Sequence, residues 1–195
     1  MPEAKSNKVK FNIKNAHVAI LTEGEDGTIT WGTPHHEPGA VSLSLDASGE
    51  TSPFYADGIV YYRSASNSGY EGDLEMAQYS DWFRENVLKE EKDAKGVLIE
   101  NSNVEPARFA FLFEFDGDVK STRHVLYDCT ATRPAIEGST TEDTKDPTTE
   151  TSTITAAPLP DGTVKAKTTA ETDAEAYNSW YQEVYVKSEA AGASA

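Results

Sequence analysis

The stretch that decides the fold is RFAFLFEFDGDVKSTRHVLYDCT, from Arg108 to Thr130. Because successive side chains of a strand point to opposite faces, its alternating phenylalanines all face the same way and need burial. A turn follows at 116–118, where Asp and Gly suit a tight turn, and a second strand-like run begins at Arg123. The stretch therefore predicts a β-hairpin with one core-facing side. The residues on that side are Phe109, Phe111, Phe113 and Phe115, and those on the other are Arg108, Ala110, Leu112 and Glu114.

The chain has the size and composition of one ordinary domain. It contains 195 residues, of which 37% are hydrophobic, and we expect a single domain over 1–195. No apolar run approaches the roughly 20 residues that span a bilayer. The start, MPEAKSNKVK, lacks the apolar centre of a secretion signal. These features predict a soluble protein made in a cytoplasm, with no membrane anchor.

The formal net charge of -16 is the strongest compositional feature. Such a surface repels phosphate, which argues against sequence-specific or tight nucleic-acid binding. Cys129 is the only cysteine, so the chain can form neither an internal disulfide nor a cysteine-based metal cage. This cysteine usage fits a reducing compartment.

Strand patterns recur along the rest of the chain. Apolar and polar residues alternate in KVKFNIK and AVSLSLD, and strand-like runs continue in HVAILT, TITWG, GVLIE and STITAAPLPDGTVKAKTT, the last with a turn at Pro160–Gly162. Short strands at regular spacing predict a mainly β fold, a β-sandwich or barrel. The residues expected to face the core in the two clearest runs are Val9, Phe11, Ile13, Val41, Leu43 and Leu45.

Two segments have helical spacing instead, Ser80–Lys89 and Asp173–Val184. Ser80 or Asp81 is expected to cap the first, and a Thr172–Glu175 capping box the second. Their aromatic stripes could be a ligand platform, but the favoured interpretation is that each stripe packs its helix on a sheet. The stripes are Tyr79, Trp82, Phe83 and Val87 in the first segment, and Tyr177, Trp180, Tyr181 and Val184 in the second.

Three segments fit neither pattern. The Thr- and Glu-rich run 138–153 has little to bury and predicts a surface loop, and 188–195 is expected to be a flexible tail. The segment 46–76 mixes turn residues with aromatic ones, and loops this long are usually functional or disordered. Its aromatic content argues against disorder, so we expect an arm with a partner surface.

The search for catalytic or metal-binding residues returns no site. Cys129 and His124 would make a nucleophile and a base, but strand alternation places them on opposite faces. We expect Cys129 to share its face with Val125 and Tyr127 as a small buried residue. The HHE run His35–Glu37 could bind a metal, yet adjacent side chains diverge and no third His or Cys stands at ligand spacing. We therefore expect no enzyme, no metal and no cofactor.

The order of several segments resembles the major tail proteins of long-tailed bacteriophages, the phi13-type group. The segments are KFNIKNAHVAILTEGEDGTITWGTP, PGAVSLSLD, FYADGIVYY, NSGYEGDLEMAQYSDWFRENVL and TVKAKTTAETDAEAYNSWYQEVYV, which together span nearly the whole chain. The most specific part precedes the helix of Trp82 and Phe83. It consists of Asn67, Gly69, Tyr70, Gly72, Leu74 and Glu75.

The resemblance implies a tail tube subunit. Its expected features are a β-sandwich or barrel with a flanking helix, hexameric rings that stack into a tube, a long loop between neighbouring subunits, and transient non-specific passage of double-stranded DNA. Its partners would be further copies of itself and the tail proteins at the tube ends, and its location the virion after assembly in the host cytoplasm. The expected inter-subunit contacts are Phe54, Tyr55, Tyr61, Tyr62, Tyr70 and Leu74.

Strand geometry also favours a shared tube. Strands lie about 4.8 Å apart and tilt about 40°, so enclosing a duplex roughly 20 Å wide takes on the order of two dozen strands, which several copies must pool. A basic wall would bind DNA and stall its transit, so we expect an acidic channel wall. Lys165 and Lys167 would contradict this expectation if their side chains faced the channel.

Two alternatives stay open. One is a tube of the same design in a phage-tail-like bacteriocin or a secretion system. The other is a monomeric β-sandwich binding module that stacks sugars on Tyr61, Tyr62 and Tyr70.

Overall fold

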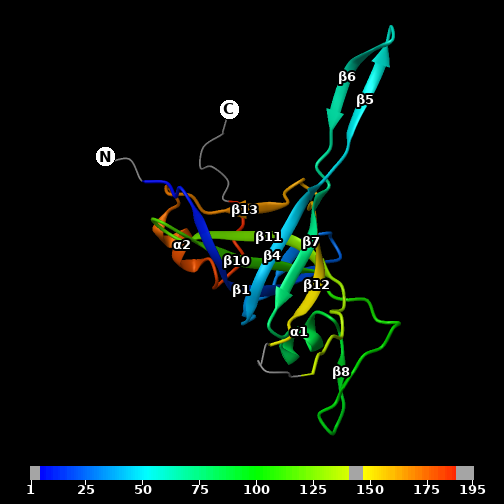
Figure 1. Ribbon diagram of the computed structural model, residues 1–195, viewed down its shortest axis with the longest axis vertical. Coiled ribbons are helices and arrows are strands. Elements are labelled where there is room, and N and C mark those ends of the chain that lie inside the picture. Colours follow the sequence, from blue (N-terminus) through cyan, green and yellow to red (C-terminus); the bar gives the residue numbers. More distant parts are fainter. Residues whose placement is uncertain (1–4, 141–146, 188–195) are drawn as a thin grey trace.

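The computed structural model describes residues 5–140 and 147–187 (Figure 1). Strands dominate, every strand pairing in these ranges is antiparallel, and the expected mainly β class is confirmed. A nine-stranded sheet has the order β2-β1-β10-β11-β12-β7-β4, with β3 added to β1 and β13 to β11. Its strands are β1 (Lys10–Glu23), β2 (Ile29–Trp31), β3 (His35–His36), β4 (Ala40–Ser48), β7 (Gly69–Met76), β10 (Phe109–Gly117), β11 (Thr122–Ala131), β12 (Glu150–Ala157) and β13 (Lys165–Lys167). Two smaller sheets pair β5 (Thr51–Ala56) with β6 (Ile59–Ala65), and β8 (Glu91–Lys92) with β9 (Leu98–Ile99).

The β10–β11 hairpin lies in the middle of the sheet, and both of its faces are buried. Phe109 and Phe111 are inaccessible on one face, as predicted. Ala110 and Leu112 on the other face are inaccessible too, because the C-terminal segment around Trp180 covers them. The expectation of a single core-facing side is therefore wrong.

Two hydrophobic cores follow from this arrangement, one on each face of the hairpin. The first core includes Val18, Leu74, Met76, Tyr79, Phe83, Phe109, Phe111, Leu126 and Ile154. The second core includes Ala110, Leu112, Val125, Tyr127, Trp180 and Val184. A strand buried on both faces reads as a continuous apolar run, which explains FAFLF at the start of β10.

The sheet bends so that β4, at one end of the strand order, contacts β1 near the other end (Figure 1). The first core fills the inside of this bend. In the described part of the chain the bend does not close into a barrel, and the expected sandwich or barrel is one curled sheet.

The segment after β12 turns where predicted but does not form a hairpin. The Gly162 N–H donates to the Leu159 carbonyl in the turn. Both β12 and β13 then pair antiparallel with β11, at Asp128–Ala131 and His124–Leu126. The two strands therefore run in the same direction along one side of β11.

A register shift in the β10–β11 pairing explains where Cys129 lies. Phe109 pairs with Cys129 but Phe111 pairs with Leu126, so one extra residue stands in β11 between these pairs. As a result Cys129 lies with Leu126 in the first core, while Val125 and Tyr127 lie in the second. The expectation that Cys129 shares a face with those two residues is wrong.

The apolar residues of the alternating runs KVKFNIK and AVSLSLD were expected to face the core, and only some of them are buried. Val9 and Phe11 are 49% and 55% exposed, because no described segment covers the first residues of β1, and only Ile13 packs on the first core. Leu43 and Leu45 also pack on this core. Val41 is exposed instead, since the β4–β7 register shifts between Ala40 and Ser42.

The first predicted helix is present but shorter than expected. Helix α1 spans Asp81–Asn86, and its N-cap Ser80 accepts a hydrogen bond from the Phe83 N–H. The positive φ of 61° at Lys89 is incompatible with helix continuation. Phe83 and Val87 are fully buried, so the aromatic stripe packs the helix on the sheet as predicted.

The second helix, α2, spans Ala174–Ser179 and also stops short of the predicted end. Its N-cap is Asp173, which accepts from the N–H groups of Glu175 and Ala176. The capping box from Thr172 is wrong, because the Thr172 hydroxyl accepts from the Thr169 N–H instead. Trp180 is buried in the turn that follows, and so the stripe still packs on the sheet.

The loop predicted over 138–153 is partly strand. Residues 150–153 belong to β12, where Ser152 is buried and pairs with Leu74. Threonine has high strand propensity, which an interpretation based on polarity overlooks. Residues 141–146 of this run, and the tail predicted over 188–195, lie outside the described residues.

Gly72 provides a test of the β4–β7 packing. A Cβ at this position would lie 1.9 Å from the Ser44 carbonyl oxygen, so Gly72→Ala must push β7 and β4 apart. We expect a loss of roughly 1–3 kcal/mol in the free energy of unfolding, measured by urea denaturation.

Gly138→Ala is the matched control, because a Cβ there meets nothing within 4 Å. Equal stability of Gly72→Ala and the control would contradict the packing described for β7.

Candidate functional site: the aromatic arm and the cationic groove

The segment 46–76, predicted as a long loop, is mostly strand. Its first residues complete β4 and its last ones form β7, while β5 and β6 make a separate hairpin that projects from the body (Figure 1). We call residues 51–65 the arm. The backbone ladder continues into it, because the Ser68 N–H donates to the Ser48 carbonyl and the Ser66 N–H to the Glu50 carbonyl. The arm is therefore a direct extension of the β4–β7 pair.

The tip of the arm is a two-residue turn at Asp57 and Gly58. Both residues have positive φ, 53° and 78°, which is the geometry of a type I′ hairpin turn. Asp and Gly are residue types that adopt it, so the sequence YADGI encodes this tip locally.

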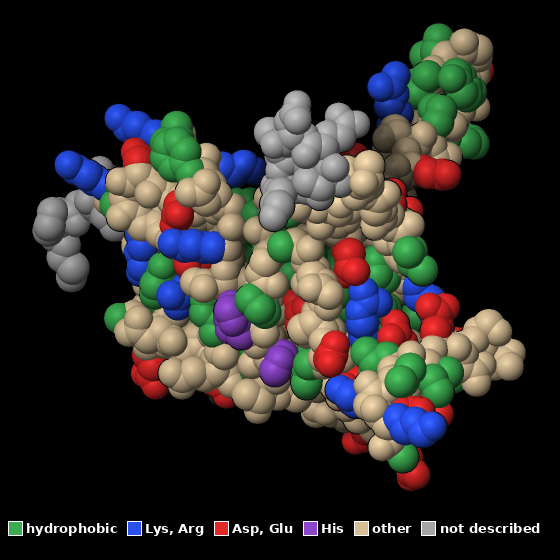
Figure 2. All heavy atoms as spheres, turned by 60° about the horizontal axis from the view of Figure 1, so that its bottom comes forward, with side chains coloured by type: hydrophobic (Ala, Val, Ile, Leu, Met, Phe, Trp, Pro, Cys, Tyr) green, Lys and Arg blue, Asp and Glu red, His purple; other side chains and the backbone are tan. Residues whose placement is uncertain are grey.

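The arm carries aromatic side chains that no described segment of its own chain covers. Figure 2 shows hydrophobic side chains gathered on its far end. A two-stranded hairpin is at best marginally stable alone, and a contiguous exposed apolar patch marks an interaction site. The exposed fractions are 61% for Phe54, 62% for Tyr55, 72% for Tyr61 and 63% for Tyr62.

The structure separates two of the predicted contact residues from the arm. Leu74 is buried in the first core of its own chain, and Tyr70 is half-buried in β7 and packs on the same core. We expected both to be poorly covered within their own subunit, and this is wrong for Leu74 and only partly right for Tyr70. Both belong to the main sheet and not to the projecting hairpin.

A groove lies where the curled sheet fails to close, between the first half of β1 and β4. Two adjoining pockets of about 200 and 300 Å³ make it up, and both are lined by Lys10, Leu43 and Phe115. The deeper, smaller pocket has an apolar floor, and we call the two pockets together the cationic groove. Residues of that floor are Leu43, Leu45, Phe113 and Phe115.

The polar residues of the deeper pocket are positive or neutral. Lys10 and Lys165 line it together with His124, and none of the described residues that line it is a carboxylate. The Lys10 Nζ lies 4.7 Å from the Phe115 ring centre, and the Lys165 Nζ lies 4.1 Å from that of Tyr70. Within the described residues neither lysine makes an ion pair. The pocket is thus basic although the chain has a net charge of -16.

His124 lies between aromatic rings at the base of the groove. Its ring stacks on Phe113, with centroids 5.1 Å apart, and meets Phe115 edge-on. Burial, reinforced by Lys167, Lys165 and Lys10, lowers the pKa of His124 to about 4. The imidazole is therefore neutral at physiological pH.

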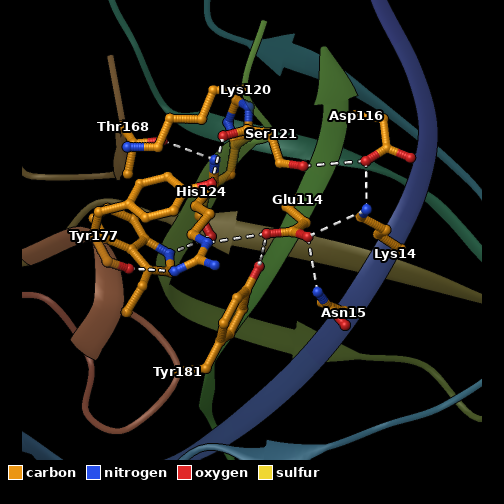
Figure 3. Close-up of polar contacts among 12 residues, drawn as sticks. Lys14, Asn15, Glu114, Asp116, Lys120, Ser121, His124, Thr168, Tyr177 and Tyr181 are labelled. Atoms are coloured by element: carbon orange, nitrogen blue, oxygen red, sulfur yellow. Dashed lines mark hydrogen bonds and ion pairs between the residues drawn. The ribbon is translucent and has the colours of Figure 1, made fainter. Parts of the chain in front are cut away.

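On the opposite face of the sheet, Glu114 is the centre of a buried polar network (Figure 3). One carboxylate oxygen accepts from Asn15 at 2.8 Å and lies 3.8 Å from the Lys14 Nζ. The other accepts from Arg123 at 3.0 Å and from the Tyr181 hydroxyl at 3.2 Å. This network joins β1, β10 and β11 to the segment after α2.

Further contacts extend the same network around α2. Lys14 also pairs with Asp116, and Arg123 donates to the Tyr177 carbonyl. The Arg123 guanidinium lies 3.8 Å from the Tyr177 ring centre and 4.9 Å from that of Tyr181. Burial raises the pKa of Tyr181 well above its usual range. Each Glu114 oxygen already has two partners, so the network is a structural anchor and offers no free base.

Sequence reasoning missed this network, although a signal for it was present. Glu114 and Arg123 lie directly opposite each other in the β10–β11 register. That register follows from the turn at 116–121, and a cross-strand pair of opposite charges could have been found from it.

The HHE run is divided among three different contacts. The His35 ring stacks on the Trp82 ring, with centroids 4.0 Å apart, and the centroids of the His36 and His17 rings are 4.9 Å apart. Glu37 is buried and accepts from the Ser80 N–H and hydroxyl, each at 2.7 Å, which holds the start of α1. Among the described residues no cluster of three His, Cys, Asp or Glu could hold a metal ion.

Cys129 is fully buried, and its thiol contacts the Leu126 carbonyl at 3.9 Å. Burial raises the pKa of this thiol, which disfavours the reactive thiolate. The expectation that His124 lies on the opposite face is wrong, because the extra residue in β11 brings both side chains to the face of the first core. His124 is stacked between phenylalanines there. Each side chain thus has a separate packing role.

No protein-family model matches the chain, and a search of curated proteins found no match. Neither α1 nor α2, nor any other helix in residues 5–140 and 147–187, has the length and apolar run needed to cross a membrane. A functional proposal therefore rests on the residues and geometry of this chain.

Glu114→Gln tests the buried network. The change removes the charge opposite the mostly buried Arg123, and we expect a loss of about 3 kcal/mol in the free energy of unfolding by urea denaturation. The control is Glu23→Gln, which also removes an arginine partner but from a carboxylate that is 54% exposed, and it should cost at most about 1 kcal/mol. Similar losses in the two variants would show that Glu114 is not an anchor.

The lowered pKa of His124 predicts acid sensitivity. Between about pH 6.5 and 4 the unfolded chain binds a proton at this imidazole and the folded chain does not. The free energy of unfolding must therefore decrease as the pH is lowered from about 6.5 to 4. The full contribution is present above about pH 6.5. In His124→Gln the fall between pH 6.5 and 4.5 should be smaller than in the wild type.

The exposed His36→Gln serves as the control for this comparison. The free energy of unfolding is measured by urea denaturation at each pH. If it falls equally in the wild type and in His124→Gln, the assigned burial of His124 is wrong.

Proposed function

We propose that this protein is a structural subunit that forms hexameric rings, and that the rings stack into the tail tube through which phage DNA passes into the host. The observation that carries the proposal is the arm, a projecting hairpin with four aromatic side chains that are each more than 60% exposed. Burying one such side chain stabilises a contact by roughly 1.5–3 kcal/mol, so four of them supply a sizeable interface.

A free sheet edge supports self-assembly further. In the described part of the chain β4 is hydrogen-bonded to β7 on one side, and no strand is hydrogen-bonded to its other edge, which faces β1 across the groove. Its sequence AVSLSLDAS contains neither proline nor lysine, the residues that usually protect an exposed edge. A strand from a second copy could pair with the unpaired backbone N–H and C=O groups of this edge, and it would extend the curled sheet.

The charge of the chain is compatible with a conduit. It has 33 acidic against 17 basic residues, and an acidic wall would let DNA slide where a basic one would bind it. The acidic wall stays a prediction. Lys165, one of the two lysines most able to contradict it, is directed at the ring of Tyr70 in the groove.

The alternatives receive less support. A tail-like bacteriocin or a secretion-system tube would use the same subunit design, and the genes next to this one separate those cases. A monomeric sugar-binding module built on Tyr61, Tyr62 and Tyr70 is disfavoured, because Tyr70 lies in the main sheet under Lys165 while the other two lie on the arm.

Concentrated protein should form rings or tubes visible by electron microscopy. Replacing residues 50–66 by a short Gly-containing turn should abolish these assemblies and leave the circular dichroism of the sheet unchanged, because the arm adds nothing to either core.

Val97→Ser is the control for loss of an exposed apolar side chain elsewhere, and it should assemble normally. A wild type that sediments as a monomer at all concentrations would contradict the proposed function. Assembly of the arm-deleted variant would show that the arm is not the interface.

A further inference from the structure

We propose that the tip of the arm, Tyr55–Ile59, docks in the cationic groove of a second copy of the chain, where Asp57 pairs with Lys10 and Lys165. The inference rests on the proposed self-assembly and names both sides of one contact. It combines two features that have no partner in the described part of the chain, an acidic aromatic tip and a basic apolar groove.

The groove has the chemistry of an acceptor for an acidic, apolar segment. Lys10 and Lys165 have no carboxylate partner in the described chain, and their ammonium groups stand over the rings of Phe115 and Tyr70. A carboxylate that enters here is attracted by two cations at the edge of an apolar floor. Both lysines are exposed, so this attraction strengthens as the docking segment excludes water from the groove.

The volume of the deeper pocket indicates that a side chain occupies it. The deeper pocket measures about 200 Å³, below the roughly 300–1,000 Å³ of sites for drug-sized ligands. One or two side chains of a narrow hairpin tip fit such a space. The adjoining pocket of about 300 Å³, beside the exposed Phe11, leaves room for the flanking residues.

The arm tip matches the groove in shape and charge. The turn at Asp57 and Gly58 presents a single carboxylate at the extreme end of the hairpin, with Tyr55 and Ile59 exposed beside it. The only basic residue of the arm, Arg63, pairs with Pro53 on the ladder and lies away from the tip.

The arm cannot reach the groove of its own chain. Its backbone ladder continues that of β4 and β7, and Figure 1 shows it directed away from the body. Six residues of β5 at about 3.3 Å each carry the tip roughly 20 Å beyond the end of the sheet. The occupant must therefore come from another molecule.

Charge reversal and rescue test the contact, with the critical concentration for assembly of the full-length protein as readout. Asp57→Asn removes the charge and keeps a residue type that tolerates positive φ. Lys165→Glu reverses the charge of one of the two lysines in the groove. Each should raise the critical concentration about tenfold or more, as expected for a partly desolvated charge pair. The double variant Asp57→Lys with Lys165→Glu should assemble better than either Asp57→Lys or Lys165→Glu alone.

Glu25→Lys, an exposed charge change in the β1–β2 turn, is the control and should assemble like the wild type. Circular dichroism of dilute protein verifies that each variant is folded. The predicted result is loss in the single variants and rescue in the double one.

Other outcomes overturn the inference in distinguishable ways. If the wild type assembles and Asp57→Asn matches it, the arm tip does not dock through Asp57 and the proposed function stands. If Lys165→Glu alone impairs assembly, the groove takes another acidic segment. If the wild type never assembles, the proposed function fails together with this contact.

Discussion

The whole structure depends on the burial of β10 and β11 from both sides. Phe109 and Phe111 on one face hold the bent half of the sheet and α1, and Ala110 and Leu112 on the other hold the C-terminal segment. A central hairpin of this kind lets one chain of modest size build two cores on a single sheet. Glu114 then fixes the C-terminal segment in place, since its carboxylate accepts from β1, from β11 and from Tyr181.

Much of the fold could be predicted from local patterns, because turns and caps act over a few residues. The phenylalanine alternation and the acidic turn identified the central hairpin. The choice of Ser80 or Asp81 as N-cap located the start of α1 to within one residue. Errors arose where the chain departs from regular geometry. One extra residue in β11 moved Cys129 to the other face, and the shift at Ala40 left Val41 exposed. Such shifts depend on tertiary packing, which no single-strand pattern contains.

The candidate site was predictable only in part for the same reason. The aromatic content of the long segment 46–76 indicated an arm. In the structure Phe54, Tyr55, Tyr61 and Tyr62 lie on this arm. Leu74 could not be separated from them by composition, because only the pairing of β7 with β4 and β12 shows it to be a core residue. The groove was invisible in the sequence, since Lys10 and Lys165 are far apart in the chain and meet only when β13 pairs with β11.

The continuity between the arm and the main sheet has a mechanical consequence. A pull on the tip, directed along the hairpin, passes straight into β4 and β7, and β7 is also paired with β12. Ladder hydrogen bonds lie perpendicular to the strands, so such a load shears them together and does not peel them one by one. Because the pull moves β4 and β7 together, the load falls on the seven residue pairs that join β7 to β12. The arm is thus attached to the sheet in the orientation that best resists tension along its axis, and a sideways load would find it far weaker.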